Sequence, residues 1–122
     1  EFVMEQYLKN VEIFYLKIQK QIQNKNPIKI CGLPITNVQK FSTGKYDFKF
    51  WKDFPDEGVR FFLNSDVNYI TIRPSGTEPK IRIFVQYRIN NIDKNNLLEK
   101  KSFAENITHA LSYEIEKQIS LS

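Results

Sequence analysis

The chain has 122 residues, of which 41% are hydrophobic and 26% charged, and its formal net charge is +4. This composition predicts one ordinary globular domain, and the positive excess is too small to indicate nucleic-acid binding by itself. Cys31 is the only cysteine, which excludes an internal disulfide and a cysteine-based zinc cluster. No apolar run reaches the length of a membrane span, so we expect a protein of the reducing cytoplasm.

The first segment predicts a surface helix with a single apolar stripe. Its apolar residues recur every three or four positions and are Met4, Leu8, Val11, Tyr15, Ile18 and Ile22. The helix is expected to end at the sequence NKNP, residues 24–27, because the residue before a proline is pushed out of the helical region. Since the helical pattern starts at once and no methionine precedes it, we expect a piece of a longer protein.

The middle of the chain predicts several short antiparallel strands joined by turns. Alternating apolar residues predict strands at residues 28–30, 38–41, 46–50, 59–63, 67–72 and 81–87. Gly32 and Pro34 are expected to end the first of these strands. Turns are expected at Gly44, at residues 54–58 and at residues 64–66.

A second amphipathic helix is predicted near the end of the chain. Its apolar stripe consists of Ala104, Ile107, Leu111, Ile115 and Ile119. Ser102 and Glu105 have the spacing of a capping box, although a start near Leu97 fits as well. Strands clustered between two amphipathic helices predict an α+β domain of two layers. We expect an antiparallel sheet of four to five strands with both helices on one face.

The sequence RPSGTEPKIRIF, residues 73–84, places many hydrogen-bond donors between two of the predicted strands. Pro74 and Pro79 each restrict one backbone angle, so the connection is stiffened near both ends. Gly76 can adopt a positive φ or let a ligand approach the backbone, and successive N–H groups in such a turn can form a concave anion site. This pattern predicts a small pocket for an anion.

The side chains of the same motif add charge and direction to that pocket. Arg73 offers a planar fork that matches two oxygens of a phosphate, and Ser75 and Thr77 offer hydroxyl groups. Alternation with the neighbouring isoleucines predicts that Lys80 and Arg82 lie on the solvent side of the strand. These groups would suit a compact dianion such as a phosphate monoester.

The motif also resembles the phosphate-binding loop of the α-D-phosphohexomutases, the family of phosphoglucomutases, phosphomannomutases and phosphoglucosamine mutases. The preceding VNYITI resembles the strand that leads into that loop, and ICGLPITNVQKF resembles, more loosely, the start of the same domain. The resemblance implies that residues 1–122 are the fourth, C-terminal domain of a larger mutase, with a fold like that of the TATA-box-binding protein. It favours a phosphoglucomutase or phosphomannomutase, with a phosphoglucosamine mutase as the alternative.

The resemblance also implies a role for each residue of the motif. The family interconverts the 1- and 6-phosphates of a hexose through a hexose 1,6-bisphosphate. The residues expected to bind the phosphate that is not being transferred are Arg73, Ser75, Gly76, Thr77 and Arg82, with Lys80 in a weaker role. The catalytic phosphoserine, the Mg²⁺ site and the sugar-binding loop belong to the other three domains. The chain alone would therefore have no catalytic or metal-binding residue, and its partners would be the hexose phosphate and those domains.

Three alternatives stay open at this stage. In a plain polar turn the hydroxyl groups would bond their own backbone, and Arg73 would pair with Glu78. A small nucleic-acid-binding module would stack bases on Phe62, Tyr69 or Phe84, but these aromatic residues are not interleaved with a cationic stripe. An interaction or dimerisation domain would need a large exposed apolar patch.

Overall fold

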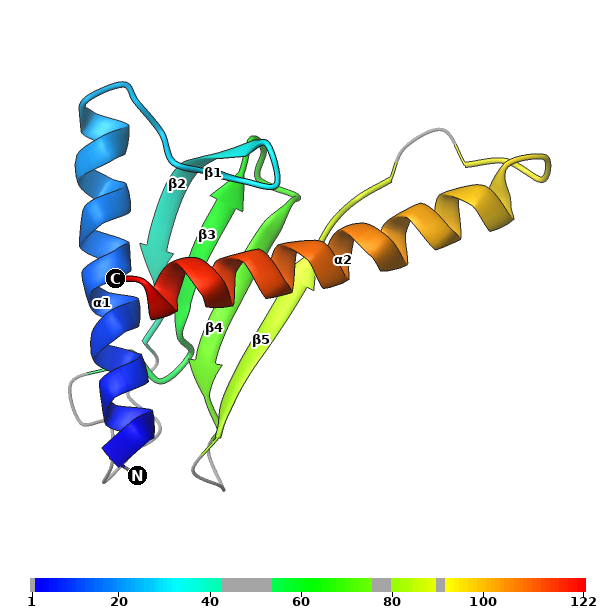
Figure 1. Ribbon diagram of the computed structural model, residues 1–122. Coiled ribbons are helices and arrows are strands. Elements are labelled where there is room, and N and C mark those ends of the chain that lie inside the picture. Colours follow the sequence, from blue (N-terminus) through cyan, green and yellow to red (C-terminus); the bar gives the residue numbers. More distant parts are fainter. Residues whose placement is uncertain (1, 43–53, 76–79, 90–91) are drawn as a thin grey trace.

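The protein folds into a sheet and a pair of helices that pack on it (Figure 1). The computed structural model describes residues 2–42, 54–75, 80–89 and 92–122. The elements are α1 (Phe2–Gln23), β1 (Lys29–Ile30), β2 (Leu33–Lys40), β3 (Val59–Leu63), β4 (Tyr69–Pro74), β5 (Ile81–Gln86) and α2 (Leu97–Ser120). The strand predicted at residues 46–50 and the turn at Gly44 lie outside the described residues. The strands form one antiparallel sheet of five strands in the order β1-β2-β3-β4-β5, which confirms the predicted α+β class.

One face of the sheet carries the hydrophobic core, and both helices pack against it. Phe61 of β3 contacts α1, with its ring centroid 5.5 Å from that of Phe14 and 6.3 Å from that of Tyr15. Helix α2 contributes the fully buried Leu111, Ile115 and Ile119 to the same core. The two helices also contact each other. Burying one large apolar side chain stabilises a fold by about 1.5–3 kcal/mol, so these stripes hold both helices on the sheet.

The predicted stripes of both helices are confirmed, with one addition, except at Met4, whose side chain lies outside the described part of the structure. The buried core residues of α1 are Leu8, Val11, Phe14, Tyr15 and Ile18. Phe14 is missing from the predicted stripe, although its spacing from Val11 and Ile18 suits the same face of the helix. Over the described residues, neither helix is apolar enough along its length to cross a membrane.

The first hairpin confirms the predicted break at Gly32 but shows that Pro34 does not break the chain's strand structure, because it lies inside β2. Cys31 and Gly32 form a two-residue turn between β1 and β2, and both have a positive φ, 51° and 80°. Two-residue turns with positive φ match the twist of antiparallel strands. Pro34 pairs with Lys29 near the start of β2, a position where a strand tolerates proline. The strand predicted at residues 38–41 is therefore the second half of a longer one.

The central strands confirm the alternation of apolar residues, with a change at each end of β4. Strand β4 begins at Tyr69, two residues after its predicted start, and continues past its predicted end at Ile72 to Pro74, so Arg73 belongs to the strand and not to the loop. The turns predicted at residues 54–58 and 64–66 are confirmed. Because an antiparallel strand presents alternate side chains to opposite faces, the extension places Arg73 on the face away from the core.

Helix α2 begins at Leu97, which was one of two starts left open by the sequence. The start predicted by a capping box at Ser102 is wrong. A hydrogen-bonded turn precedes the helix instead. The Asp93 carboxylate accepts the N–H groups of Asn95 and Asn96 over 2.8 and 3.1 Å, and the Asn96 amide oxygen accepts the Asp93 N–H over 2.8 Å. This earlier start lets the first part of α2 extend beyond the β5 edge of the sheet (Figure 1).

The buried hydroxyl group of Tyr7 is expected to make the stability of the fold depend on alkaline pH. It is buried and has no hydrogen-bond partner among the described residues. Burial and, to a smaller extent, the charge of Glu116 raise the pKa of Tyr7 to about 12. The folded state favours the neutral form of the Tyr7 phenol. The resulting contribution to the free energy of unfolding is therefore fully present below about pH 10, and it is lost as the pH rises through the pKa of the folded state.

We expect Tyr7→Phe to remove this alkaline loss of stability and to leave the free energy of unfolding near pH 7 unchanged or slightly higher. The reason is that a buried hydroxyl without a partner costs free energy and phenylalanine has none. Urea unfolding of both proteins at neutral pH and near pH 11 measures the difference. A variant that loses as much stability at alkaline pH as the parent would contradict this assignment.

Candidate anion-binding site

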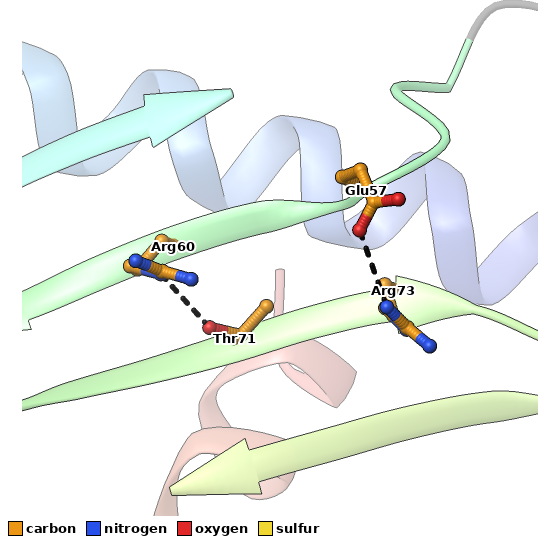
Figure 2. Close-up of polar contacts among 4 residues, drawn as sticks. All are labelled: Glu57, Arg60, Thr71 and Arg73. Atoms are coloured by element: carbon orange, nitrogen blue, oxygen red, sulfur yellow. Dashed lines mark hydrogen bonds and ion pairs between the residues drawn. The ribbon is translucent and has the colours of Figure 1, made fainter. Parts of the chain in front are cut away.

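The second face of the sheet, called here the open face, points away from both helices. Its side chains come from alternate positions of β3, β4 and β5 and are Arg60, Phe62, Tyr69, Thr71, Arg73, Arg82, Phe84 and Gln86. Figure 2 shows Arg60, Thr71 and Arg73 on this side of the sheet, with the helices behind it. Three of these side chains are arginines, so positive charge is concentrated on this face.

Arg73 and Arg82 lie directly opposite each other on β4 and β5. Arg82 is exposed, as its alternation with the neighbouring isoleucines predicts, and 41% of the Arg73 side chain remains accessible. Opposed side chains in an antiparallel pair have Cβ atoms about 4.5–5.5 Å apart, and like charges at such positions are destabilising. An anion bound between the two guanidinium groups would replace this repulsion by attraction.

The connection from β4 to β5 is closed at its base by a hydrogen bond. The N–H of Ser75 donates to the carbonyl oxygen of Lys80 over 2.8 Å, so this amide is occupied by the protein itself. Ser75 is only 5% exposed and forms part of the base of the loop, whereas Lys80 is exposed as predicted. Gly76 and Thr77, the other predicted phosphate ligands, lie outside the described residues. The structure therefore brings the described members of the predicted site to one end of the β4–β5 pair.

Arg73 makes two contacts that the sequence does not reveal. Its Nη1 donates to Oε2 of Glu57 over 3.2 Å (Figure 2), and its guanidinium carbon lies 5.4 Å from the centroid of the Phe84 ring. The alternative partner suggested by the sequence, Glu78, lies outside the described residues. The Nε of Arg73 is buried without a hydrogen-bond partner in the described part of the chain. Since arginine has five N–H donors, the bond to Glu57 leaves capacity for an external anion.

Gly58 is a further residue of the site that sequence reasoning missed. Its φ is +88°, and a Cβ atom there would collide with the carbonyl oxygen of Ile72 and lie 2.6 Å from Cβ of Arg73. The backbone just before β3 therefore lies in close contact with the part of β4 that carries Arg73. A glycine in the turn at residues 54–58 hints at a positive φ, but the contact itself depends on the register of β3 against β4.

Aromatic rings on the open face lie against arginines. The guanidinium carbon of Arg60 is 4.1 Å from the centroid of Tyr69 and 4.7 Å from that of Phe41, and its Nε donates to Thr71 Oγ1 over 3.1 Å. Phe62 is only 8% exposed. The expectation that aromatic and cationic side chains are not interleaved is therefore wrong for this face. The guanidinium groups nevertheless lie over aromatic rings on which the bases of a nucleic acid would have to stack. This arrangement disfavours the open face as a surface for binding nucleic acid.

The charged side chains of the open face within the described residues are arginines, not metal-ligating groups. Within residues 2–42, 54–75, 80–89 and 92–122, no group of three His, Cys, Asp or Glu side chains is placed to hold a metal ion. The described residues therefore do not fit the Mg²⁺ that the family resemblance implies, and that resemblance assigns the ion to another domain. Arg73 and Arg82, which lie at opposed positions of β4 and β5, have side chains that match oxygen anions.

Comparison with known proteins finds similarity to curated phosphoglucomutases. Phosphoglucomutases of Staphylococcus epidermidis, strains RP62A and FDA PCI 1200, are each 29% identical over 82 residues, which is 62% of this chain and 15% of those proteins. The phosphoglucomutase of Staphylococcus saprophyticus is 26% identical over 96 residues, 74% of this chain and 17% of that protein. No family model and no solved structure matches. The chain spans less than a fifth of the length of these relatives and contains a phosphoglucomutase-related region.

Proposed function

We propose that the chain is the C-terminal, substrate-phosphate-binding domain of a phosphohexomutase, of the phosphoglucomutase or phosphomannomutase type. In this role residues 1–122 are one domain of an isomerase that interconverts the 1- and 6-phosphates of a hexose. The domain would bind the phosphate that is not being transferred. The chemical step, the Mg²⁺ site and most contacts to the hexose 1,6-bisphosphate would belong to the other domains. The observation that carries the proposal is the direct opposition of Arg73 and Arg82 beside the β4–β5 connection.

The charges of this pair suit a phosphate monoester. A phosphate dianion has enough oxygens to accept hydrogen bonds from two guanidinium groups at once, and each hydrogen bond to a charged group contributes about 1.5–3 kcal/mol. The donors of Arg73 that Glu57 does not use can form such bonds, and 41% of this side chain is exposed. Lys80 adds a further cation at the same end of β5.

The position of the pair also suits the catalytic cycle of a mutase. The intermediate must be held with either of its two phosphates away from the reacting centre. Contacts to the charge of a phosphate serve in both orientations, whereas contacts to single hydroxyl groups do not. Binding energy from this remote group can then hold the reacting end in place. The domain would thus position the substrate without touching the bond that breaks.

A titration of the chain with phosphate ligands tests the proposal. We expect inorganic phosphate and glucose 6-phosphate, at millimolar concentrations, to shift the amide NMR signals of Ser75, Lys80 and Arg82. The affinity should fall with added salt, because the contacts are between charges. Glucose without phosphate should leave these signals in place.

Two results would count against the proposal. One is the absence of shifts at these residues with either phosphate ligand at millimolar concentration. The other is salt-dependent binding of a single-stranded oligonucleotide with shifts spread along the open face, at Tyr69 and Phe84, and stronger than the binding of phosphate. That pattern would favour the nucleic-acid-binding alternative.

A further inference from the structure

We propose that Phe84 is a positioning residue for phosphate binding, which it supports by holding the guanidinium group of Arg73 against its ring. The proposal rests on the proposed function of the Arg73–Arg82 pair. Phe84 would not contact the phosphate itself. Its effect would be to keep Arg73 in an orientation from which an anion can be bound at little conformational cost.

The register of the sheet explains why this ring meets this arginine. Thr71 is opposite Phe84, and Arg73 is opposite Arg82, so Phe84 and Arg73 are diagonal neighbours on the open face. Diagonal neighbours lie about 7–8 Å apart, which long side chains and aromatic rings can bridge. The guanidinium carbon lies 5.4 Å from the ring centroid, within the range of a cation–π contact.

Phe84 contacts Arg73 but is not part of the hydrophobic core. It is 46% exposed, whereas the alternate residues of β5, Ile81, Ile83 and Val85, pack against the core on the other face. Replacing the ring therefore changes little of the buried apolar surface. The effect of such a replacement on ligand binding can be separated from an effect on folding.

The two groups that hold Arg73 differ in what happens when an anion binds. Glu57 occupies one N–H of Nη1 with a carboxylate, and an incoming phosphate competes for that donor. Phe84 makes a cation–π contact and offers no hydrogen-bond acceptor, so the ring does not compete with a phosphate for the N–H donors of Arg73. A free arginine side chain carries about 2 kcal/mol of rotamer entropy, part of which must be lost when it binds a ligand. Contact with the ring removes part of that cost in advance.

Arg60 shows that the same arrangement is used elsewhere on the open face. Its guanidinium group lies against the rings of Tyr69 and Phe41, at 4.1 and 4.7 Å from their centroids. Its Nε has an acceptor, Thr71 Oγ1, whereas the Nε of Arg73 has none in the described part of the chain. Both guanidinium groups thus lie over aromatic rings, but Arg73 retains N–H donors that no described residue uses, on the strand beside Arg82.

The test compares Phe84→Leu with Phe84→Tyr in the 122-residue chain, with inorganic phosphate as the ligand. We expect Phe84→Leu to weaken phosphate binding about two- to five-fold, the range of an exposed cation–π contact, and Phe84→Tyr to bind like the parent. The ring current of residue 84 should shift the δ-methylene proton signals of Arg73 upfield, and this shift should disappear in Phe84→Leu only. Phe103→Leu, the same replacement at a 50% exposed site on α2, serves as the control.

The outcomes separate this inference from the proposed function. If the parent chain binds phosphate and Phe84→Leu binds equally well, only the positioning role is overturned. Phe84→Tyr binding as weakly as Phe84→Leu, or an Arg73 signal that is the same in all three chains, would also overturn it. If the parent chain binds no phosphate, the proposed function and the positioning role fall together.

Discussion

Replacing Gly58 by alanine is expected to lower the free energy of unfolding by about 3–5 kcal/mol, from overpacking and a strained positive φ together. The added Cβ atom would collide with the carbonyl oxygen of Ile72 and would lie 2.6 and 2.9 Å from Cβ and Cα of Arg73. These neighbours are largely backbone atoms of a central strand, so no rotation of a side chain can relieve the contact. Strands β3 and β4 would have to separate locally.

Gly32→Ala is the matched control for this prediction. Gly32 also has a positive φ, +80°, but a Cβ atom there would meet no other atom within 4 Å. The control therefore measures the cost of the backbone conformation alone, about 1–2 kcal/mol. Urea or thermal unfolding of the two variants gives the comparison. Equal losses of stability in both variants would show that the close approach of Gly58 to Arg73 has no energetic consequence.

Gly58→Ala should also weaken phosphate binding more than its loss of stability implies. The collision displaces the backbone of Arg73, and a displacement of about an ångström is enough to misalign charged hydrogen bonds. Gly32→Ala should leave phosphate binding unchanged, because Gly32 lies in the β1–β2 turn at the other edge of the sheet. The position of Arg73 in the site thus depends on the close approach of Gly58 in the turn before β3.

Arg82→Gln is expected to weaken phosphate binding about ten- to hundred-fold while leaving the fold as stable as before or slightly more stable. The two effects have one cause. Without a ligand, Arg82 and Arg73 repel each other across β4 and β5, so removing one charge relieves that repulsion. With a phosphate bound, the same change removes hydrogen bonds between charged groups. If Arg82 had only a structural role, its replacement would lower the stability of the fold and leave phosphate binding unchanged.

Phosphate titration and thermal unfolding of Arg82→Gln measure both halves of this prediction. Arg88→Gln is the control, since Arg88 is exposed beyond the end of β5 and its loss changes the net charge equally. The control should bind phosphate almost as the parent does. An Arg82→Gln protein that is clearly less stable, and that binds phosphate like the control, would rule out the pair as the anion site.

Local patterns in the sequence predicted most of the secondary structure, because both stripes and alternation depend on neighbours along the chain. The helical stripes of α1 and α2 and the strands at β3 and β5 are confirmed from such patterns. The errors lie at boundaries. Gly32 breaks the first strand as predicted, but Pro34 lies within β2, because the turn at Cys31 and Gly32 starts the second strand of the hairpin just before it. Ser102 has a capping-box spacing, yet the turn at Asp93 starts the helix earlier.

The sequence by itself determined the class of the fold, the exposed position of Arg82 and the segment, residues 73–82, whose described polar side chains gather at one end of the β4–β5 pair. Only the tertiary structure decided which residues surround Arg73. Glu57, Gly58 and Phe84 reach Arg73 from β5 and from the turn before β3, and no spacing along the chain indicates these contacts. The physical reason is that such contacts follow from strand register, which is set by packing of the whole core against α1 and α2.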